Sequence, residues 1–190
     1  MIEPKFNNVS NENIQLKYKD IDLNVHISRS VAVVGVVIAY YDNSFNVLIT
    51  KRSEKMIDEP GKISLPCGFL DWNERLYDAM IREVHEETSL YLPDYEKYCI
   101  FNNDKKHFYL NDNPLTNRQN VTLSYITVLD FKDYSQNIPF DIENYSCVET
   151  SWVKWLKIIN AYTADYDWAF NHDETIKNAF NFFNTNYKNK

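Results

Sequence analysis

The sequence predicts an α/β fold in which a mixed β-sheet is flanked by helices. Two segments rich in β-branched residues, VAVVGVVIAY and VTLSYITVLDF, have the composition of buried strands. One amphipathic helix is expected in the middle of the chain, over residues 74–88, and another near its end, where apolar residues recur at helical spacing. Strands and helices distributed in this way are typical of a sheet with helices packed against it.

The chain has the size of one domain. Its 190 residues, of which 44% are hydrophobic, suffice for a core without metal or disulfide support. We expect an N-terminal extension over residues 1–28, in which the alternating segment IDLNVHI predicts an edge strand. A single domain should follow over residues 29–190, because neither an internal repeat nor a linker-like composition interrupts it.

The remaining elements follow in order. VAVVGVVIAY is apolar on both faces and predicts a central strand, with FNVLITKR as its hairpin partner across a DNS turn. DEPGKISLPCG holds two of the three glycines of the chain, which indicates a loop with an unusual backbone path. YEKYCIF predicts a short strand, KKHFYLNDNPLTNRQN a polar connection, and SWVKWLKI a further strand.

Charge and cysteine usage narrow the class of protein. The net charge of −7 and the lack of a Lys/Arg-rich run argue against a nucleic acid as the main partner. A phosphate ligand remains compatible with this charge, because a divalent cation can bridge an acidic site and an anion. Three cysteines without CxxC spacing, no secretory signal and no apolar run of membrane-spanning length predict a cytoplasmic protein with no membrane partner.

The helix over residues 74–88 carries a pattern that needs an explanation. Its apolar stripe consists of Leu76, Ala79, Met80 and Val84, and the same third of the helix surface also holds Glu83, Glu86 and Glu87. Carboxylates four residues apart repel each other, and acids near a helix C-terminus oppose the helix dipole. Such violations tend to mark functional sites, and oxygen ligands alone favour Mg²⁺ or Mn²⁺. A solvated acidic face is an equal alternative on these residues alone.

The stretch from residue 68 to residue 90 resembles the Nudix box, G-x5-E-x7-R-E-U-x-E-E-x-G-U, where U is a bulky aliphatic residue. Its defined positions are filled by Gly68, Glu74, Arg82, Glu83, Val84, Glu86, Glu87 and Leu90. Ser89 stands where the family has glycine. The likeness continues in Pro60-Gly61, in Leu65-Pro66-Cys67-Gly68 and in the run from Ala169 to Ile176, and thus covers roughly residues 30–185. The chain is therefore similar to Nudix hydrolases, which implies their α/β/α sandwich.

The departure at Ser89 concerns the end of the helix. A glycine just past a helix end usually has a left-handed backbone, which costs another residue roughly 1–2 kcal/mol. Since the metal-ligand positions of the box are all filled, we expect activity to survive this change.

The resemblance implies hydrolysis of a nucleoside diphosphate linked to another moiety, with Mg²⁺ as the cofactor and Mn²⁺ as a substitute. The implied metal ligands are the carboxylates of Glu83, Glu86 and Glu87 and the carbonyl of Gly68. Arg82 would hold one glutamate ionised through a charge-assisted hydrogen bond, although a surface ion pair of little consequence is its alternative.

Nudix hydrolases differ in which glutamate takes the proton from water. Some use a residue of the box, where Glu83 and Glu86 are the candidates, and others use a glutamate of a later loop. Glu149, just before SWVKW, is our candidate for the second arrangement, with Glu143 as a weaker competitor. An ordinary exposed loop acid is an equally good reading of Glu149.

Charge and position make Arg52 and Arg118 candidate phosphate ligands, with surface cations as the alternative. The segment after the box is similar to that of Nudix proteins handling ADP-ribose, although the proline often associated with that specificity is missing. An ADP-ribose-like compound is thus favoured over nucleotide sugars, dinucleoside polyphosphates and nucleoside triphosphates. The alternative function is a non-catalytic Nudix nucleotide sensor or binding module. A homodimer is a candidate assembly by analogy with many relatives.

Overall fold

The computed structural model describes residues 12–114, 120–132, 142 and 145–187. Its main sheet is mixed, as predicted, with the strand order β10–β4–β3–β9–β7. The long strands are β3 (Val31–Tyr41), β4 (Ser44–Arg52), β9 (Val121–Asp130) and β10 (Thr150–Lys157), and β7 (Cys99–Phe101) is short. β3 and β9 are parallel, whereas β4 is antiparallel to both β3 and β10.

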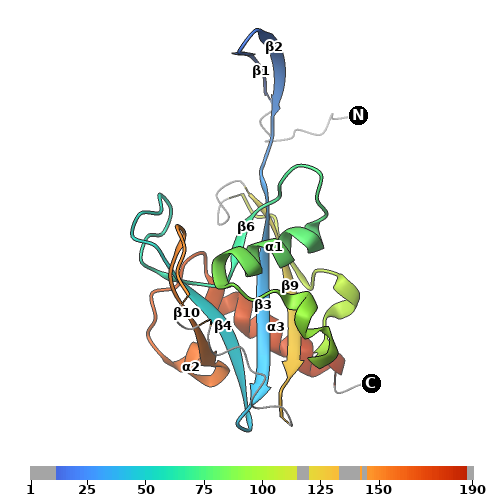
Figure 1. The fold of residues 1–190 in the computed structure, drawn as a ribbon, viewed down its shortest axis with the longest axis vertical. Coiled ribbons are helices and arrows are strands. Elements are labelled where there is room, and N and C mark those ends of the chain that lie inside the picture. Colours follow the sequence, from blue (N-terminus) through green and yellow to red (C-terminus); the bar gives the residue numbers. More distant parts are fainter. Residues whose placement is uncertain (1–11, 115–119, 133–141, 143–144, 188–190) are drawn as a thin grey trace, which may run out of the picture.

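Shorter elements complete the sheet and cover it. β5 (Ile63–Ser64) pairs with β4, β6 (Cys67–Phe69) with β3, and β8 (Tyr109–Asn111) with β9. The helices are α1 (Leu76–Thr88), α2 (Ile158–Thr163) and α3 (His172–Tyr187), with 3-10 helices at Leu92–Tyr98 and Asn103–Lys105. α1 and α3 lie on opposite faces of the sheet (Figure 1), which makes the three-layer α/β/α arrangement.

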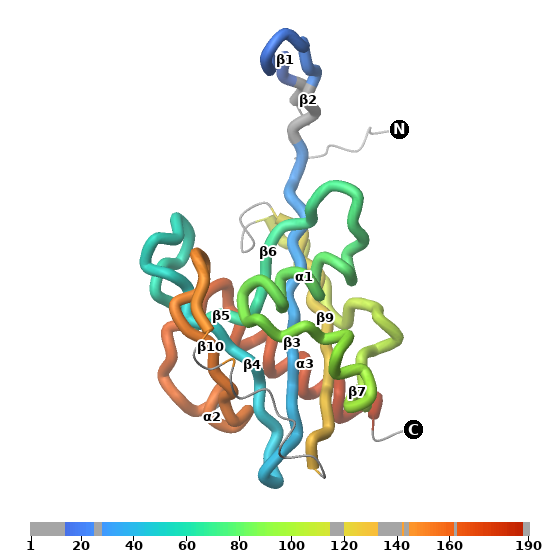
Figure 2. Tube along the Cα trace, in the orientation of Figure 1, coloured from blue at the N-terminus to red at the C-terminus, as the bar shows by residue number. Residues whose placement is uncertain are grey.

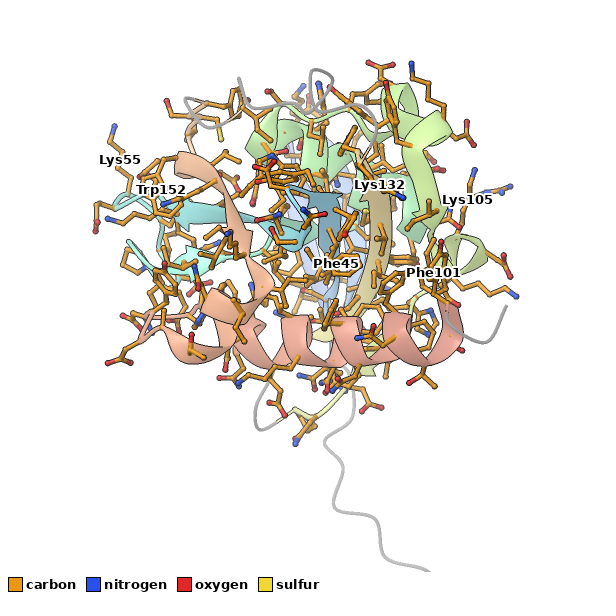
Figure 3. The ribbon with its side chains drawn as sticks, turned by 90° about the horizontal axis from the view of Figure 1, so that it is seen from below. Phe45, Lys55, Phe101, Lys105, Lys132 and Trp152 are labelled. Atoms are coloured by element: carbon orange, nitrogen blue, oxygen red, sulfur yellow. The ribbon has the colours of Figure 1, made fainter. Side chains whose placement is uncertain are left out.

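Alternation along β3 divides the core into two layers. Val33, Val37 and Ala39 pack with Ala79, Met80 and Val84 of α1, whereas Val34, Val36 and Ile38 pack with Ile176, Ala179 and Phe183 of α3. On the α3 side, the rings of Phe45 and Phe101 approach Phe183 edge-on, with centroid separations of 5.6 and 5.5 Å. Figure 3 shows Phe45 and Phe101 on the side of the sheet that faces α3.

The sheet opens at one end because β3 and β4 part from each other. They pair only from Ile38 to Tyr41 on β3. Beyond that point β3 pairs with β6, and β4 pairs with β5. A backbone hydrogen bond of 2.9 Å from Gly35 N–H to Pro66 O holds the inserted loop in the gap. The end of β4 and the strand β6 therefore face each other across an opening.

The N-terminal part forms a separate hairpin of β1 (Glu12–Tyr18) and β2 (Ile21–Ile27), which stands away from the body (Figures 1 and 2). The segment IDLNVHI is thus a strand, but it pairs with β1 and does not form an edge of the main sheet. Pairing sets Leu16 opposite Leu23 and Tyr18 opposite Ile21, and these four side chains are 40–61% exposed.

Two other expectations shift locally. The central helix begins at Leu76, two residues later than expected, and its N-cap is Arg75, which makes no side-chain capping bond. The segment YEKYCIF is a strand only in its last three residues, because a 3-10 helix with proline in its first turn occupies the preceding part. In the described part of the chain, no helix combines the length and apolar character that crossing a bilayer requires.

Ser89 adopts the left-handed backbone that the family glycine would have. Its φ and ψ are 58° and 5°, and its N–H donates a 2.8 Å hydrogen bond to His85 O. α1 therefore ends as it would with glycine, and serine carries the conformational cost.

We expect Ser89→Gly to raise the free energy of unfolding by about 1 kcal/mol, because glycine relieves the left-handed strain but gains backbone freedom when unfolded. In a chain of this size, this corresponds to a rise of roughly 2–4 °C in the melting temperature, measurable by calorimetry. Ser146→Gly is the control, since Ser146 is exposed and has no positive φ. Equal shifts for the two variants would contradict the assignment of strain to Ser89.

Candidate active site

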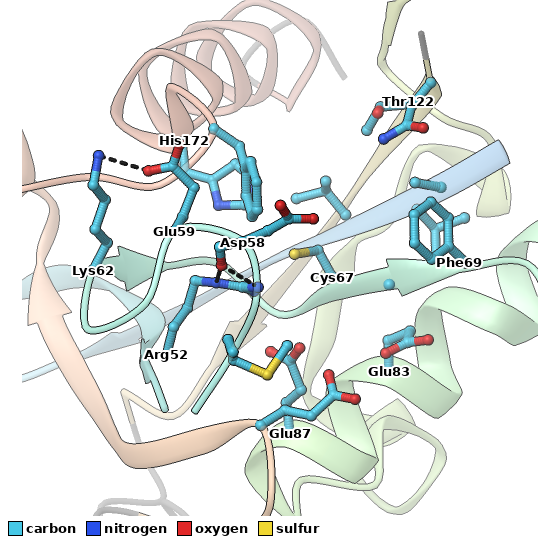
Figure 4. A pocket seen from close by; sticks show the side chains of 18 of the residues that line it. Arg52, Asp58, Glu59, Lys62, Cys67, Phe69, Glu83, Glu87, Thr122 and His172 are labelled. Atoms are coloured by element: carbon cyan, nitrogen blue, oxygen red, sulfur yellow. Dashed lines mark hydrogen bonds and ion pairs between the residues drawn. The ribbon is translucent and has the colours of Figure 1, made fainter. Parts of the chain in front are cut away.

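A pocket of about 970 Å³ lies where the sheet opens (Figure 4). Its walls come from the end of β4 and the loop after it, from β3, β6, β8, β9 and α1, and from the residues just before and within the first turn of α3. The pocket brings together most of the predicted site residues, namely Arg52, Gly68, Arg82, Glu83, Glu86, Glu87 and Glu149. Arg118 and Glu143 lie outside the described residues.

Two of the three box carboxylates of α1 are buried. Glu83 is 7% and Glu87 is 4% exposed, whereas the side chain of Glu86 is 57% exposed. Burial raises the pKa of Glu87 well above its ordinary value of 4.5, and the neighbouring Glu83 raises it further. Burial also raises the pKa of Glu83, although Arg82 opposes the shift. The protein thus places two carboxylates where a positive charge is needed to keep them ionised.

Arg82 connects these carboxylates to the rest of the site. Its guanidinium donates to Glu83 Oε1 at 2.6 Å and to Glu86 Oε2 at 3.0 Å. On its other side, it donates to both carboxylate oxygens of Glu74 at 2.7 and 3.1 Å and to Phe69 O at 2.9 Å. The hydrogen bonds to Arg82 hold the pKa of Glu74 below its usual range. Glu74 also accepts a 2.7 Å bond from the Asp71 N–H, so the loop before α1 is tied to the same group.

Gly68 leaves space for the carboxylate of Glu83. A Cβ atom built on Gly68 would overlap with all three carboxyl atoms of Glu83. Gly68 has no positive φ, so close approach, and not backbone conformation, is the reason for glycine at this position.

Arg52 brings a buried positive charge to the pocket. It is 7% exposed, its Nε and Nη2 donate to Asp58 O at 3.1 and 2.9 Å, and its guanidinium carbon lies 4.9 Å from the ring centroid of Phe170. Among the described residues, no carboxylate forms an ion pair with it. Arg52 and Glu87 line the same pocket, and the charge of Arg52 lowers the pKa of Glu87.

Glu149 is exposed at the rim of the pocket. Its carbonyl accepts a 2.7 Å hydrogen bond from the Ser53 N–H, which ties this loop to the end of β4. Its negative charge raises the pKa of both Glu83 and Glu87, so the three carboxylates share one electrostatic environment. The Tyr145 hydroxyl donates a 3.0 Å bond to Glu86 O and holds the preceding segment against α1.

His172 is a pocket residue to which sequence reasoning assigned no role. It is 3% exposed, and its Nδ1 accepts a 2.9 Å hydrogen bond from the Leu65 N–H and lies 3.2 Å from Ser64 Oγ. Burial, together with the charge of Arg52, lowers its pKa to about 3. The imidazole is therefore neutral, with its proton on Nε2. In the sequence, the only sign that His172 has a role is its place in the run from Ala169 to Ile176. Its hydrogen-bond partners, Leu65 and Ser64, lie 107 and 108 residues earlier in the chain.

The donor set fits a hard divalent cation, because it contains carboxylate and carbonyl oxygens only. The raised pKa values of Glu83 and Glu87 point the same way, since a bound cation would offset the burial of charge. In the described part of the chain, no three acidic, His or Cys side chains are already gathered at metal-binding distances. Glu83 and Glu86 are instead bonded to Arg82.

The fold and the arrangement of the box are those of one protein family. The model of the NUDIX domain matches residues 30–178, so the chain belongs to the NUDIX family. No curated protein matches the chain.

Solved structures share this fold. The NUDIX domain of Shewanella oneidensis NrtR complexed with ADP ribose has a TM-score of 0.59 and 18% identity, covering 83% of this chain and 90% of that one. S. oneidensis NrtR complexed with a 27mer DNA has a TM-score of 0.62 and 23% identity, and the match covers 82% of this chain but 62% of NrtR. A C. elegans Ap4A hydrolase binary complex has a TM-score of 0.57 and 17% identity, covering 82% of this chain and 98% of that one. At these identities the likeness concerns the fold.

We expect His172→Asn to remove a source of acid sensitivity. Between pH 6.5 and about 3 the unfolded chain protonates this histidine and the folded chain does not, so the parent loses stability as the pH falls. Asparagine keeps an acceptor for Leu65 but does not titrate. The stability difference between parent and variant, measured by urea unfolding at pH 7, 6 and 5, should therefore shrink with falling pH, by at most about 1.4 kcal/mol per pH unit. A difference independent of pH would show that His172 has the same pKa in the folded and the unfolded chain, which would contradict the lowered pKa.

Proposed function

We propose that this NUDIX protein is a divalent-metal-dependent hydrolase that cleaves the pyrophosphate of a nucleoside diphosphate linked to another moiety. One observation carries the proposal. The buried carboxylates Glu83 and Glu87 and the buried cation Arg52 border a single pocket of about 970 Å³. The acidic side suits a metal ion, and Arg52 suits the phosphate oxygens that such an ion would leave uncompensated.

In this proposal Glu83, Glu86, Glu87 and the carbonyl of Gly68 hold Mg²⁺, or Mn²⁺ in its place. When bound, such a cation neutralises the pyrophosphate and lowers the pKa of a coordinated water.

The residues of the chain itself position and neutralise the reactants. Arg82 orients the carboxylates of Glu83 and Glu86 by hydrogen bonding, and its charge opposes the rise in the pKa of Glu83. Glu149 at the rim accepts the proton of the attacking water, with the exposed Glu86 as the second candidate for this role. Arg52 contacts a phosphate through the guanidinium face that is directed away from Asp58. Arg118 is a second candidate phosphate ligand, and only its charge supports this role.

The favoured substrate is a compound similar to ADP-ribose. Its support is the resemblance of the segment after the box, together with the complex of the NrtR NUDIX domain with ADP ribose. Dinucleoside polyphosphates come next, since a C. elegans relative in fold is an Ap4A hydrolase. Nucleotide sugars and nucleoside triphosphates are the remaining candidate substrates.

The second candidate is a non-catalytic nucleotide-binding module. NrtR has this fold and was solved with DNA, although this chain spans 62% of its length. The complete set of box carboxylates favours turnover, because a module that only binds nucleotides has no need for two buried acids beside each other.

The two candidates differ in turnover. The purified chain should release phosphatase-sensitive monophosphates in a Mg²⁺-dependent manner from at least one of ADP-ribose, NADH, diadenosine polyphosphates, nucleotide sugars and dNTPs. We expect Glu86→Gln to lower kcat by roughly 10²-fold or more. The matched control is Glu96→Gln, an exposed glutamate outside the pocket. No turnover of any compound, or equal kcat for Glu86→Gln and the parent, would disprove the hydrolase.

Metal binding can also be tested without substrate, through Glu87→Gln. In metal-free protein the raised pKa of Glu87 means that the folded state binds more protons than the unfolded state, so stability falls as the pH rises above 4.5 through the folded pKa. Glutamine has no charge to bury. At pH 8 in EDTA the variant should therefore melt a few degrees above the parent.

Added Mg²⁺ should raise the melting temperature of the parent and leave that of Glu87→Gln almost unchanged. Glu96→Gln should follow the parent under both conditions. A parent that melts at the same temperature in EDTA and in Mg²⁺ would count against a metal site at these carboxylates.

A further inference from the structure

Strand pairing builds a second surface inside the same pocket. One row of paired residues runs across β6, β3, β9 and β8 as Phe69, Ala32, Thr122 and Asn111, and the next row as Cys67, Val34, Ser124 and Tyr109. Paired residues point to the same face of a sheet, and so do residues two apart on a strand. The eight side chains therefore share one face, and all eight line the pocket.

α3 leaves only the first of these rows uncovered. In the second row, Val34 is 3% exposed and belongs to the cluster that α3 completes, and Ser124 is 2% exposed. Farther along the same face, Val36 and Ile38 are buried in the cluster that includes Ile176 of α3. The helix begins at His172, and its first turn lines the edge of the pocket. The first row, with Ala32 and Thr122 half-buried and Phe69 exposed, thus forms the stretch of the sheet face that lies beyond the start of the helix.

The surface has the shape of a trough. Its middle carries small side chains, such as Ala32 and Thr122, while its edges carry Phe69 on β6 and Tyr109 on β8, which are 56% and 39% exposed. Three strand spacings separate β6 from β8, which corresponds to about 14 Å between backbones. A half-exposed phenylalanine in the wall of a pocket points to a ligand that covers it.

The eight residues of the trough carry no formal charge. The charged groups of the pocket lie on other elements: on α1, at the end of β4 and in the loop after it, and at Asp71 and Glu149. Figure 4 shows Phe69 and Thr122 toward one end of the pocket, with Arg52 and His172 toward the other. An uncharged surface bordered by the aromatic side chains of Phe69 and Tyr109 suits a planar heteroaromatic ring better than a phosphate.

Phe69 is held in a fixed position relative to the carboxylates. Its carbonyl accepts a 2.9 Å hydrogen bond from Arg82 Nη2, and the following Leu70 N–H donates to Val31 O at 3.0 Å. The same guanidinium binds Glu83. In addition, the Cα atom of Phe69 lies only about 3.8 Å from that of Gly68. A ring stacked on Phe69 would therefore keep a constant distance from the acidic side of the pocket.

We propose that the trough is the subsite for the nucleobase of the substrate and that the base stacks on the ring of Phe69, with Tyr109 as the opposite wall. The hydroxyl group of Thr122 and the amide group of Asn111 border the plane of the ring and discriminate between bases. This inference rests on the proposed function, since it assigns the other end of the same nucleotide.

The test compares ligands with and without a base. Binding of AMP, GMP, CMP, UMP and ribose 5-phosphate is measured by calorimetry for the parent, Phe69→Leu and Tyr91→Leu. Leucine keeps apolar volume but removes the ring face, and Tyr91 is a 47% exposed aromatic residue outside the pocket. At least one nucleotide should bind the parent 10-fold or more tightly than ribose 5-phosphate does. Phe69→Leu should weaken that nucleotide about 10-fold and leave ribose 5-phosphate unchanged, and Tyr91→Leu should behave as the parent.

Kinetics add a second readout. For the best substrate, Phe69→Leu should raise KM about 10-fold and keep kcat within about 3-fold of the parent value. For 5-phosphoribosyl 1-pyrophosphate, a pyrophosphate without a base, the same substitution should change KM only slightly. The subsite is wrong if nucleotides and ribose 5-phosphate bind the parent equally. It is also wrong if Phe69→Leu binds the nucleotide as the parent does, or weakens both kinds of ligand equally.

The binding measurements need no turnover, so the two proposals can fail separately. Base-dependent binding that is lost in Phe69→Leu, in a chain that hydrolyses nothing, would overturn the hydrolase and support the subsite. Hydrolysis with base binding independent of Phe69 would overturn the subsite and support the hydrolase.

Discussion

The site depends on the guanidinium of Arg82, whose side chain is 25% exposed and donates five hydrogen bonds. They reach Glu74 before α1, Glu83 and Glu86 within it, and the carbonyl of Phe69 on β6. One planar cation thus fixes a loop, a helix face and a strand relative to one another. Lysine could not replace it, because a single ammonium group lacks the fork of donors that these acceptors require.

The divergence of β3 and β4 provides the space in which this network operates. β6 fills part of the gap and has a different environment on each side. Toward α1, Gly68 gives room to the carboxylate of Glu83. Toward the α3 side, Cys67 and Phe69 belong to an uncharged sheet surface. A three-residue strand therefore separates the acidic part of the pocket from an uncharged one.

Prediction from sequence worked best where one element carries the information. The central helix begins within two residues of its expected start, and its apolar stripe is buried through Ala79, Met80 and Val84. Prediction failed where distant segments meet. His172 receives its hydrogen bond from a residue 107 positions earlier, and β8 exists only because it pairs with β9. No local pattern distinguishes such residues from ordinary polar or aromatic ones.

The sequence by itself determined the chemistry of the carboxylates, because helical periodicity alone places Glu83, Glu86 and Glu87 on one side of α1. It also determined where α1 ends, and Ser89 accepts the left-handed backbone there. Only the tertiary structure decided which of these acids are buried and which groups face them. Exposure and long-range neighbours depend on how strands pair and where the sheet opens, and pairing joins residues whose distance along the chain carries no signal of their contact.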